Sequence, residues 1–190
     1  MISVQAHPEL HPAHPDCQRW LGEVVPGLVV LRMCPAGGER YGHLTVAAVP
    51  CDHVHGLAHA VVALWKGAAC MDEEWTYDLW RPDRDTWAFA SYRERYAAWS
   101  ASTSRSEADF LGWLLPRCVE TIRAQHTLEP PLCAPDHHPD PAAVRSAGIE
   151  ELDYLREPAL RAVLLDRWND CEGLFQHRGW WFLASWGTSA

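Results

Sequence analysis

Three segments of the chain hold short runs of hydrophobic residues of the kinds that favour strands, and these runs predict β structure. Residues 27–49 hold two β-type runs, GLVVLRM and YGHLTVAAV, which are separated by a turn with two adjacent glycines. Glycine tolerates the positive φ that tight turns between antiparallel strands require. Apolar and polar side chains alternate over residues 74–80, and residues 173–187 hold two runs around an Arg-Gly pair. The sequence therefore predicts antiparallel hairpins at about 27–49, 74–80 and 173–187.

The final run, GWWFLASWG, is apolar on both of its faces. One face of this run carries Trp181, Leu183 and Ser185, and the other carries only apolar residues, so both faces are largely apolar. A strand covered on one side only shows a polar face, whereas a strand covered on both sides does not. We therefore expect this strand to lie in the centre of a sheet.

Apolar residues recur every three or four positions in other segments, which is typical of helices with one buried face. The first such segment, residues 52–65, begins at an aspartate that can cap a helix. Residues 89–99 form the second. Ser106 is predicted to open a third helix, which Pro116 should kink or split. A further helical run, interrupted by a proline, is predicted to end at Trp168.

Two proline-rich stretches bear on the domain organisation. Residues 1–15 contain His-Pro three times, and residues 129–141 contain five prolines. Proline disfavours helix in the residue before it, so residues 1–15 are predicted to be an extended arm and residues 129–141 a loop. Residues 16–190 are then predicted to form a single compact α+β domain, because hairpins and short helices follow one another without a βαβ rhythm.

The charge and composition of the chain indicate which kinds of partner, and which cellular location, can be expected. The 190 residues carry a formal net charge of −9 without a basic stripe, which argues against nucleic acid or an anionic membrane as the main partner. No apolar run approaches the roughly 18 residues that span a bilayer, and the first residues lack the pattern of a signal peptide. Seven scattered cysteines without a CxxC pair are typical of reduced thiols. A cytoplasmic protein is expected.

The segment 72–87 combines six carboxylates with three of the eleven tryptophans, one tyrosine and two arginines. Aromatic and arginine side chains dominate the binding energy of protein interfaces, and surrounding charge steers the partner. This composition favours a docking surface for a basic protein. The predicted partner-binding residues are Asp72, Glu73, Glu74, Trp75, Tyr77, Trp80 and Arg81.

His55 and His59, in the sequence HGLAH, are four positions apart. On a helix they would lie one above the other, a spacing that lets two imidazoles bind one zinc ion. The metalloprotease motif HExxH has a glutamate directly after its first histidine, but this chain has Gly56 there. A zinc site would therefore need a remote carboxylate, and without a metal the pair is expected to lie on a partly exposed helix face.

Two other groups contain residue types that bind zinc, but neither has the spacing of a zinc finger, so both are interpreted as solvated polar segments. These groups are Cys133, Asp136, His137 and His138 in one case, and His7, His11, His14 and Cys17 in the other. The chain also lacks the GxSxG, GxxxxGK[ST] and GxGxxG motifs.

The sequence as a whole predicts a small acidic, cytosolic, protein-binding domain of a toxin-neutralising or regulatory type, with a basic protein partner, no catalytic activity and no cofactor. The alternative is a zinc-dependent hydrolase with a dispersed site that includes His55 and His59. Metal analysis of untagged protein discriminates between the two classes.

Overall fold

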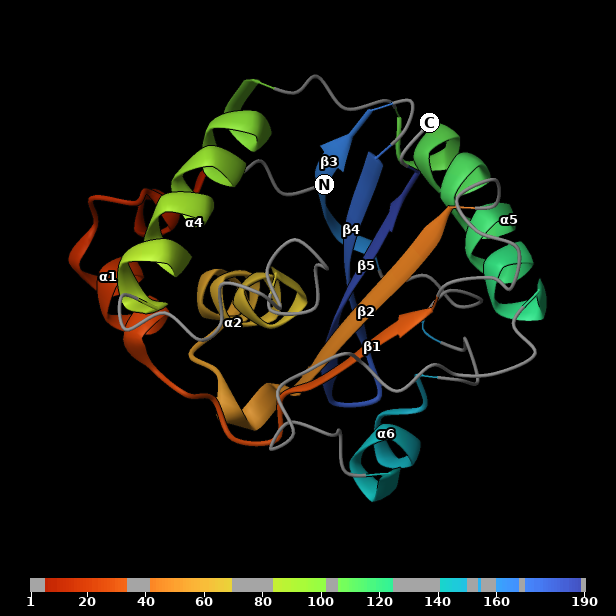
Figure 1. The fold of residues 1–190 in the computed structure, drawn as a ribbon, viewed down its shortest axis with the longest axis horizontal. Coiled ribbons are helices and arrows are strands. Elements are labelled where there is room, and N and C mark those ends of the chain that lie inside the picture. Colours follow the sequence, from red (N-terminus) through yellow and green to blue (C-terminus); the bar gives the residue numbers. More distant parts are fainter. Residues whose placement is uncertain are drawn as a thin grey trace.

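The computed structural model of the protein describes residues 6–33, 42–69, 84–101, 106–124, 141–149, 154, 160–167 and 170–188. These residues form a five-stranded antiparallel sheet with helices on both faces, which confirms the predicted α+β class (Figure 1). The strands are β1 (Val29–Met33), β2 (His43–Pro50), β3 (Leu160–Asp166), β4 (Asp170–His177) and β5 (Trp180–Gly187). The helices are α1 (Pro15–Gly22), α2 (Leu57–Ala69), α4 (Arg84–Ala101), α5 (Glu107–Ala124) and α6 (Pro141–Ala147).

The strand order in the sheet is β1-β2-β5-β4-β3, and every neighbouring pair is antiparallel. β5 is therefore the central strand, as its two apolar faces predict. The pairs β1–β2 and β4–β5 confirm the hairpins predicted at 27–49 and 173–187. Between β4 and β5 the chain turns at Arg178 and Gly179, both with positive φ. The hairpin predicted at 74–80 lies outside the described residues.

Each face of the sheet carries its own apolar cluster. α1, α2 and α4 lie on one side of the sheet, and α5 lies on the other (Figure 1). Ala47, Leu174 and Leu183 face α2, whereas Phe175 and Phe182 belong to the cluster beneath α5 and α6. α2 is buried on most of its surface because it packs against the sheet as well as against α1 and α4. The sheet is thus covered on both sides.

The predicted helical run up to Trp168 is wrong for residues 160–166, which form β3. Ala162, Leu164 and Leu165 pack into one apolar cluster, while Val163 packs into the other. A strand buried on both faces has a continuous apolar run, which a helix can also have. Register shifts in the β3–β4 pairing interrupt the alternation further.

The helix predicted for residues 52–65 begins later than expected. Cys51–His53 form a single 3₁₀ turn, and α2 starts only at Leu57. Gly56 has φ 95°, a value that a right-handed helix cannot include. Asp52 is therefore not the cap of α2, and His55 precedes this helix.

The helix predicted from Ser106 is present as α5, and the Ser106 hydroxyl accepts a hydrogen bond from the Asp109 backbone N–H at 3.2 Å. α5 continues through Pro116, so the prediction that this proline could split the helix is wrong. Pro116 cannot donate to the carbonyl of Gly112. Both residues are exposed, so water can hydrate that carbonyl.

The segment predicted to be an extended arm is folded against the domain in its described part. Pro8–Leu10 form a 3₁₀ turn, and Pro15 is the first residue of α1. Proline suits the first position of a helical turn because its φ is already fixed there. Leu10 is buried, and its carbonyl accepts a hydrogen bond from the Tyr92 hydroxyl at 2.9 Å. The arm prediction thus fails for residues 6–15.

Among the described residues, no helix has both the length and the apolar character needed to cross a bilayer.

Candidate functional site

A row of polar side chains crosses the sheet on the face that α2 covers. Arg32 of β1 is in register with Thr45 of β2, Thr45 with Ser185 of β5, and Ser185 with Glu172 of β4. Residues in register have their side chains on the same face of a sheet. On each of these strands, the residue two positions further into the domain lies on the same face of the sheet and is apolar. The polar row therefore marks one end of this apolar core.

This polar row lines a pocket with a volume of about 290 Å³. On β2, β5 and β4, the residues two positions nearer the end of the sheet also line the pocket, and these are His43, Gly187 and Asp170. α2 contributes Trp65 and two alanines of its last turn, and α4 contributes Arg95. The pocket thus lies between the end of α2, α4 and the polar end of the sheet. Residues from both halves of the chain are needed to form it.

Two acidic residues of β4 interact with one arginine in this pocket. The Arg95 guanidinium donates to Glu172 Oε1 at 2.6 Å and lies 3.5 Å from Asp170 Oδ2. The Ser185 hydroxyl also donates to Glu172 Oε1, at 3.1 Å. The Glu172 side chain is 1% exposed, and its other oxygen, Oε2, has no hydrogen-bond partner among the described residues. Buried polar atoms are nearly always paired, so Oε2 is an acceptor suited to a ligand.

Asp170 differs chemically from an ordinary surface aspartate. Burial, together with the nearby Glu172 carboxylate, raises the pKa of Asp170 from 3.8 to about 6, while Arg95 and Arg167 act in the opposite direction. Asp170 can therefore exchange a proton close to neutral pH. Acidic groups with raised pKa values in a pocket are characteristic of binding and catalytic sites.

The pair His55 and His59 does not have the geometry expected of two ligands on one helix face. His59 is buried and its ring stacks on Trp20, with 5.0 Å between the ring centroids. Its Nδ1 accepts the backbone N–H of His55 at 3.1 Å, much as the third residue of a capping box bonds back across the start of a helix. Burial lowers the pKa of His59, and the Glu23 carboxylate, 3.5 Å from Nε2, opposes that change.

His59 is therefore a neutral structural side chain at the start of α2, and the expectation of a partly exposed helix face is wrong for it. Among the described residues, no group of three histidine, cysteine, aspartate or glutamate side chains is placed to bind a metal ion. Zinc binding by this pair stays a prediction.

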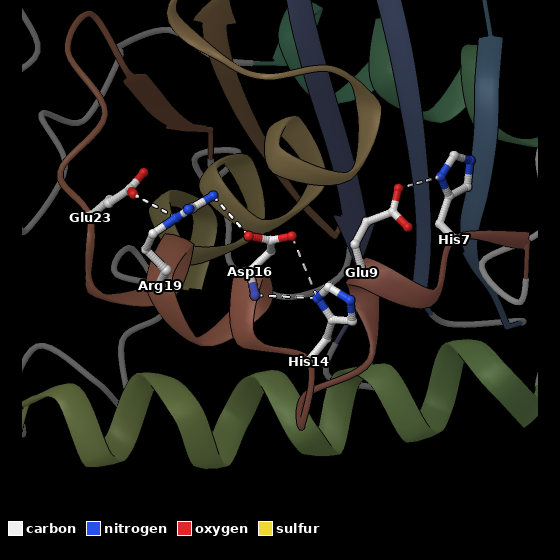
Figure 2. A network of polar contacts seen from close by, with 6 residues as sticks. All are labelled: His7, Glu9, His14, Asp16, Arg19 and Glu23. Carbon is white, nitrogen blue, oxygen red and sulfur yellow. Dashed lines mark hydrogen bonds and ion pairs between the residues drawn. The ribbon is translucent and has the colours of Figure 1, made fainter.

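The histidines near the start of the chain serve local structure (Figure 2). His14 Nδ1 accepts the Asp16 backbone N–H at 3.2 Å and so caps α1. His7 Nδ1 lies 3.1 Å from a carboxylate oxygen of Glu9. Arg19 lies between Asp16, at 2.9 Å, and the carboxylate of Glu23, at 3.4 Å. This network of polar contacts orders α1 and the turn before it.

Two other members of this histidine group also have structural roles. The ring of His11 packs edge-on against Tyr96, with 5.4 Å between the centroids. Cys17 is fully buried, and burial raises the pKa of its thiol to about 11. A thiol that stays protonated is a poor metal ligand.

The remaining predicted site residues lie outside the described residues. They comprise the whole partner-binding set and the second zinc-type group, namely Asp72, Glu73, Glu74, Trp75, Tyr77, Trp80 and Arg81, with Cys133, Asp136, His137 and His138. The sequence predictions missed every described residue that lines the pocket.

No protein-family model, no curated protein and no solved structure matches this chain.

Proposed function

We propose that this protein binds a small polar molecule in the pocket formed by the polar row, Asp170, Arg95 and the end of α2. The observation that carries the proposal is Glu172, whose side chain is 1% exposed and whose Oε2 lacks a partner among the described residues. A buried polar atom without a hydrogen bond costs about 1–3 kcal/mol, and more when the group is charged. A ligand that donates a hydrogen bond to Oε2 recovers this energy.

The size of the pocket supports a small ligand. Its volume of about 290 Å³ is at the lower end of the range of roughly 300–1,000 Å³ that ligand pockets occupy. Its lining is also polar enough to orient a ligand, since donors and acceptors come from four strands and one helix. A peptide or a nucleic-acid strand would not fit inside such a volume, so a compact molecule of metabolite size is the best match.

A thermal-shift screen with a mixed library of small polar metabolites tests this function. Ligands that bind only the folded state raise its melting temperature in proportion to the logarithm of their concentration. The pocket-filling variant Ala69→Leu should lose the shifts, because residue 69 lines the pocket. Ala97→Leu is the matched control, since it makes the same change at an exposed position of α4. Shifts of equal size in both variants, or none in the wild type, would refute a ligand pocket here.

We also propose, as a second function, that the segment 72–87 docks a basic protein, and that it does so in the cytoplasm. Its support is the local density of carboxylates and aromatic side chains in a chain with a net charge of −9. With a captured partner, charge reversal at Glu73 and Glu74 should slow association and weaken its salt dependence, whereas Trp75→Ala should speed dissociation. Kinetics that are unchanged by both kinds of variant would place the docking surface elsewhere.

A further inference from the structure

Ser185 and Glu172 present two hydrogen-bond acceptors to the pocket that they line. A carboxylate can only accept, so the Ser185 hydroxyl donates its single proton to Glu172 Oε1, at 3.1 Å. The Ser185 oxygen keeps its lone pairs but has no second proton to offer a ligand. Among the described residues, no group donates to Glu172 Oε2 or to this oxygen. Both atoms are therefore acceptors for a ligand.

The two acceptors are close enough to share one donor group. Ser185 Oγ is 3.1 Å from Oε1, and the two oxygens of a carboxylate are about 2.2 Å apart, so Oγ is at most about 5.3 Å from Oε2. An N–H···O hydrogen bond spans about 2.9 Å between nitrogen and oxygen, so one nitrogen atom can reach both oxygens. It needs at least two N–H bonds to do so. A hydroxyl has one proton and can satisfy only one of the two acceptors.

We propose that the ligand of this pocket carries an amino group, a nitrogen with at least two N–H bonds, which donates to both Glu172 Oε2 and Ser185 Oγ. This inference rests on the proposed ligand-binding function and specifies the class of ligand. Primary amines and primary amides share this chemistry. Arg95 also donates to Glu172 Oε1, at 2.6 Å, so Oε1 is occupied and the carboxylate is held in one orientation, with Oε2 left for the ligand.

Asp170 adds to the set of acceptors. It lines the same pocket, two residues away from Glu172 along β4 and on the same face of the sheet. Burial and the Glu172 carboxylate raise the pKa of Asp170 to about 6, against the opposing effect of Arg95 and Arg167. At pH 7 Asp170 is mostly ionised and can accept a further hydrogen bond. This third acceptor suits a protonated primary amine, which has three N–H bonds.

NMR titration with matched pairs of probes tests the inference, because the members of each pair differ in N–H bonds but not in charge. The first pair is n-butylammonium and butyltrimethylammonium, and the second is butyramide and N,N-dimethylbutyramide. We expect the N–H-bearing member of at least one pair to shift the backbone amide signals of Thr45, Ser185 and Gly187, which lie around the pocket. Its Kd should be at least about tenfold lower than that of its methylated partner, which leaves the acceptors unpaired.

Glu172→Gln is the diagnostic variant. Because Arg95 and Ser185 both donate to Oε1, the amide oxygen of the glutamine should take that place, and its NH₂ group should take the place of Oε2. An acceptor thereby becomes a donor, so the preference for the N–H-bearing probe should fall by about tenfold or more. A preference caused only by the bulk of the methyl groups would persist. Asp52→Asn, at an exposed position that does not line the pocket, is the control and should keep the preference.

Ser185→Ala removes the second acceptor and gives a test that does not depend on Glu172→Gln. Binding of the N–H-bearing probe should weaken by a smaller factor than in Glu172→Gln, while the affinity for the methylated probe stays the same. Circular dichroism of both variants checks that they fold. If Glu172→Gln does not fold, Ser185→Ala alone decides whether the assigned hydrogen bonds exist.

The possible outcomes separate the inference from the function beneath it. Equal affinities within both pairs would overturn the amino-group class while the pocket kept its proposed function. A preference that is undiminished in the folded Glu172 and Ser185 variants would overturn the assigned hydrogen bonds. If no probe shifts the pocket amides, the amino-group class is wrong. The metabolite screen with Ala69→Leu then decides separately whether the pocket binds anything else.

Discussion

His55 and His59 are four positions apart but have unlike surroundings. His55 is exposed and lies before α2, whereas His59 is buried inside its first turn. Only the backbone N–H of His55 takes part in the hydrogen bond to His59 Nδ1. The His55 side chain can therefore be removed without loss of this bond, and the His59 side chain cannot.

This difference predicts a clear contrast in stability. His59→Ala should lower the free energy of unfolding by about 1–3 kcal/mol, because it removes the stack on Trp20 and leaves the His55 N–H without its acceptor. His55→Ala should change it by less than about 0.5 kcal/mol, as exposed substitutions usually do. Urea unfolding of both variants, with and without added zinc, measures the contrast. Equal losses, or stabilisation of the wild type alone by zinc, would restore the metal interpretation of the pair.

The pocket shows why its own residues could not be predicted from the sequence. Arg32, Thr45, Glu172 and Ser185 are each ordinary in their local context. Ser185, for example, is the only polar residue on its face of β5 before the strand ends, which is common at strand ends. What joins the four is the register of three strand pairs, and one of those pairs, β2–β5, links distant parts of the chain. Spacing in the sequence carries no information about such a register.

Among the elements, the two hairpins were predictable because their signals are local. Strand-type runs and a turn with glycine occur within a few residues of each other, and the strand partners are neighbours in the chain. β3 was not predictable in this way, because the run AVLL is equally compatible with a buried strand or a buried helix. The choice is made by β4, which offers β3 a free edge with which to pair. Elements that depend on such a partner escape local analysis.

β5 is the element on which the sheet depends most, since it pairs with β2 on one side and with β4 on the other. A chain that ends before Trp180 should therefore fail to fold. It would lose Phe182 and Leu183, both fully buried, along with Trp181 and Trp186. Loss of one buried aromatic side chain costs roughly 3–5 kcal/mol, against a total stability of about 5–15 kcal/mol.

Circular dichroism and thermal unfolding of this truncated chain measure the effect. A matched control is a chain that ends after Gly187, which keeps β5 whole and should unfold with the cooperativity of the full chain. A truncation before Trp180 that unfolds cooperatively would contradict the central role of β5.

At the scale of the whole molecule, the partly buried Asp170 and the buried His59 make the free energy of unfolding depend on pH. The pKa of Asp170 is about 6 in the folded state, against an ordinary value of 3.8. Between these two values the folded protein binds more protons than the unfolded chain, so the contribution of Asp170 to stability falls as the pH rises. This contribution is complete below about pH 4 and is lost as the pH passes through about 6. His59, with its lowered pKa, acts in the opposite sense below about pH 6.5.

Comparison with Asp170→Asn isolates the first of these effects. The free energy of unfolding of the wild type, relative to that of Asp170→Asn, should increase as the pH is lowered from about 7 to about 4. Urea unfolding at several pH values in this range provides the measurement. Asp52→Asn, at an exposed position outside the pocket, should show no such trend. A difference between wild type and Asp170→Asn that is constant with pH would show that the Asp170 carboxyl titrates normally.

The fold class was predictable, whereas the topology was not. Hairpins and helices without a βαβ rhythm indicate an α+β protein, and the sheet agrees. The insertion of β5 between β2 and β4 has no signal in the local sequence, because it depends on how the two apolar faces of the sheet are filled. The same holds for the first described residues, whose prolines start turns that pack on the domain.

The pairing of β2 with β5 also has a consequence for synthesis of the protein. β2 leaves the ribosome as one strand of a two-stranded ribbon, and its partner β5 is made more than a hundred residues later. At roughly 5–20 residues per second, this delay is on the order of ten seconds. During this delay, β2 in the nascent chain has one unpaired edge and apolar side chains on both of its faces. Such an intermediate is a natural target for chaperones and a site of early aggregation, so the yield of active protein should depend on chaperone supply during translation.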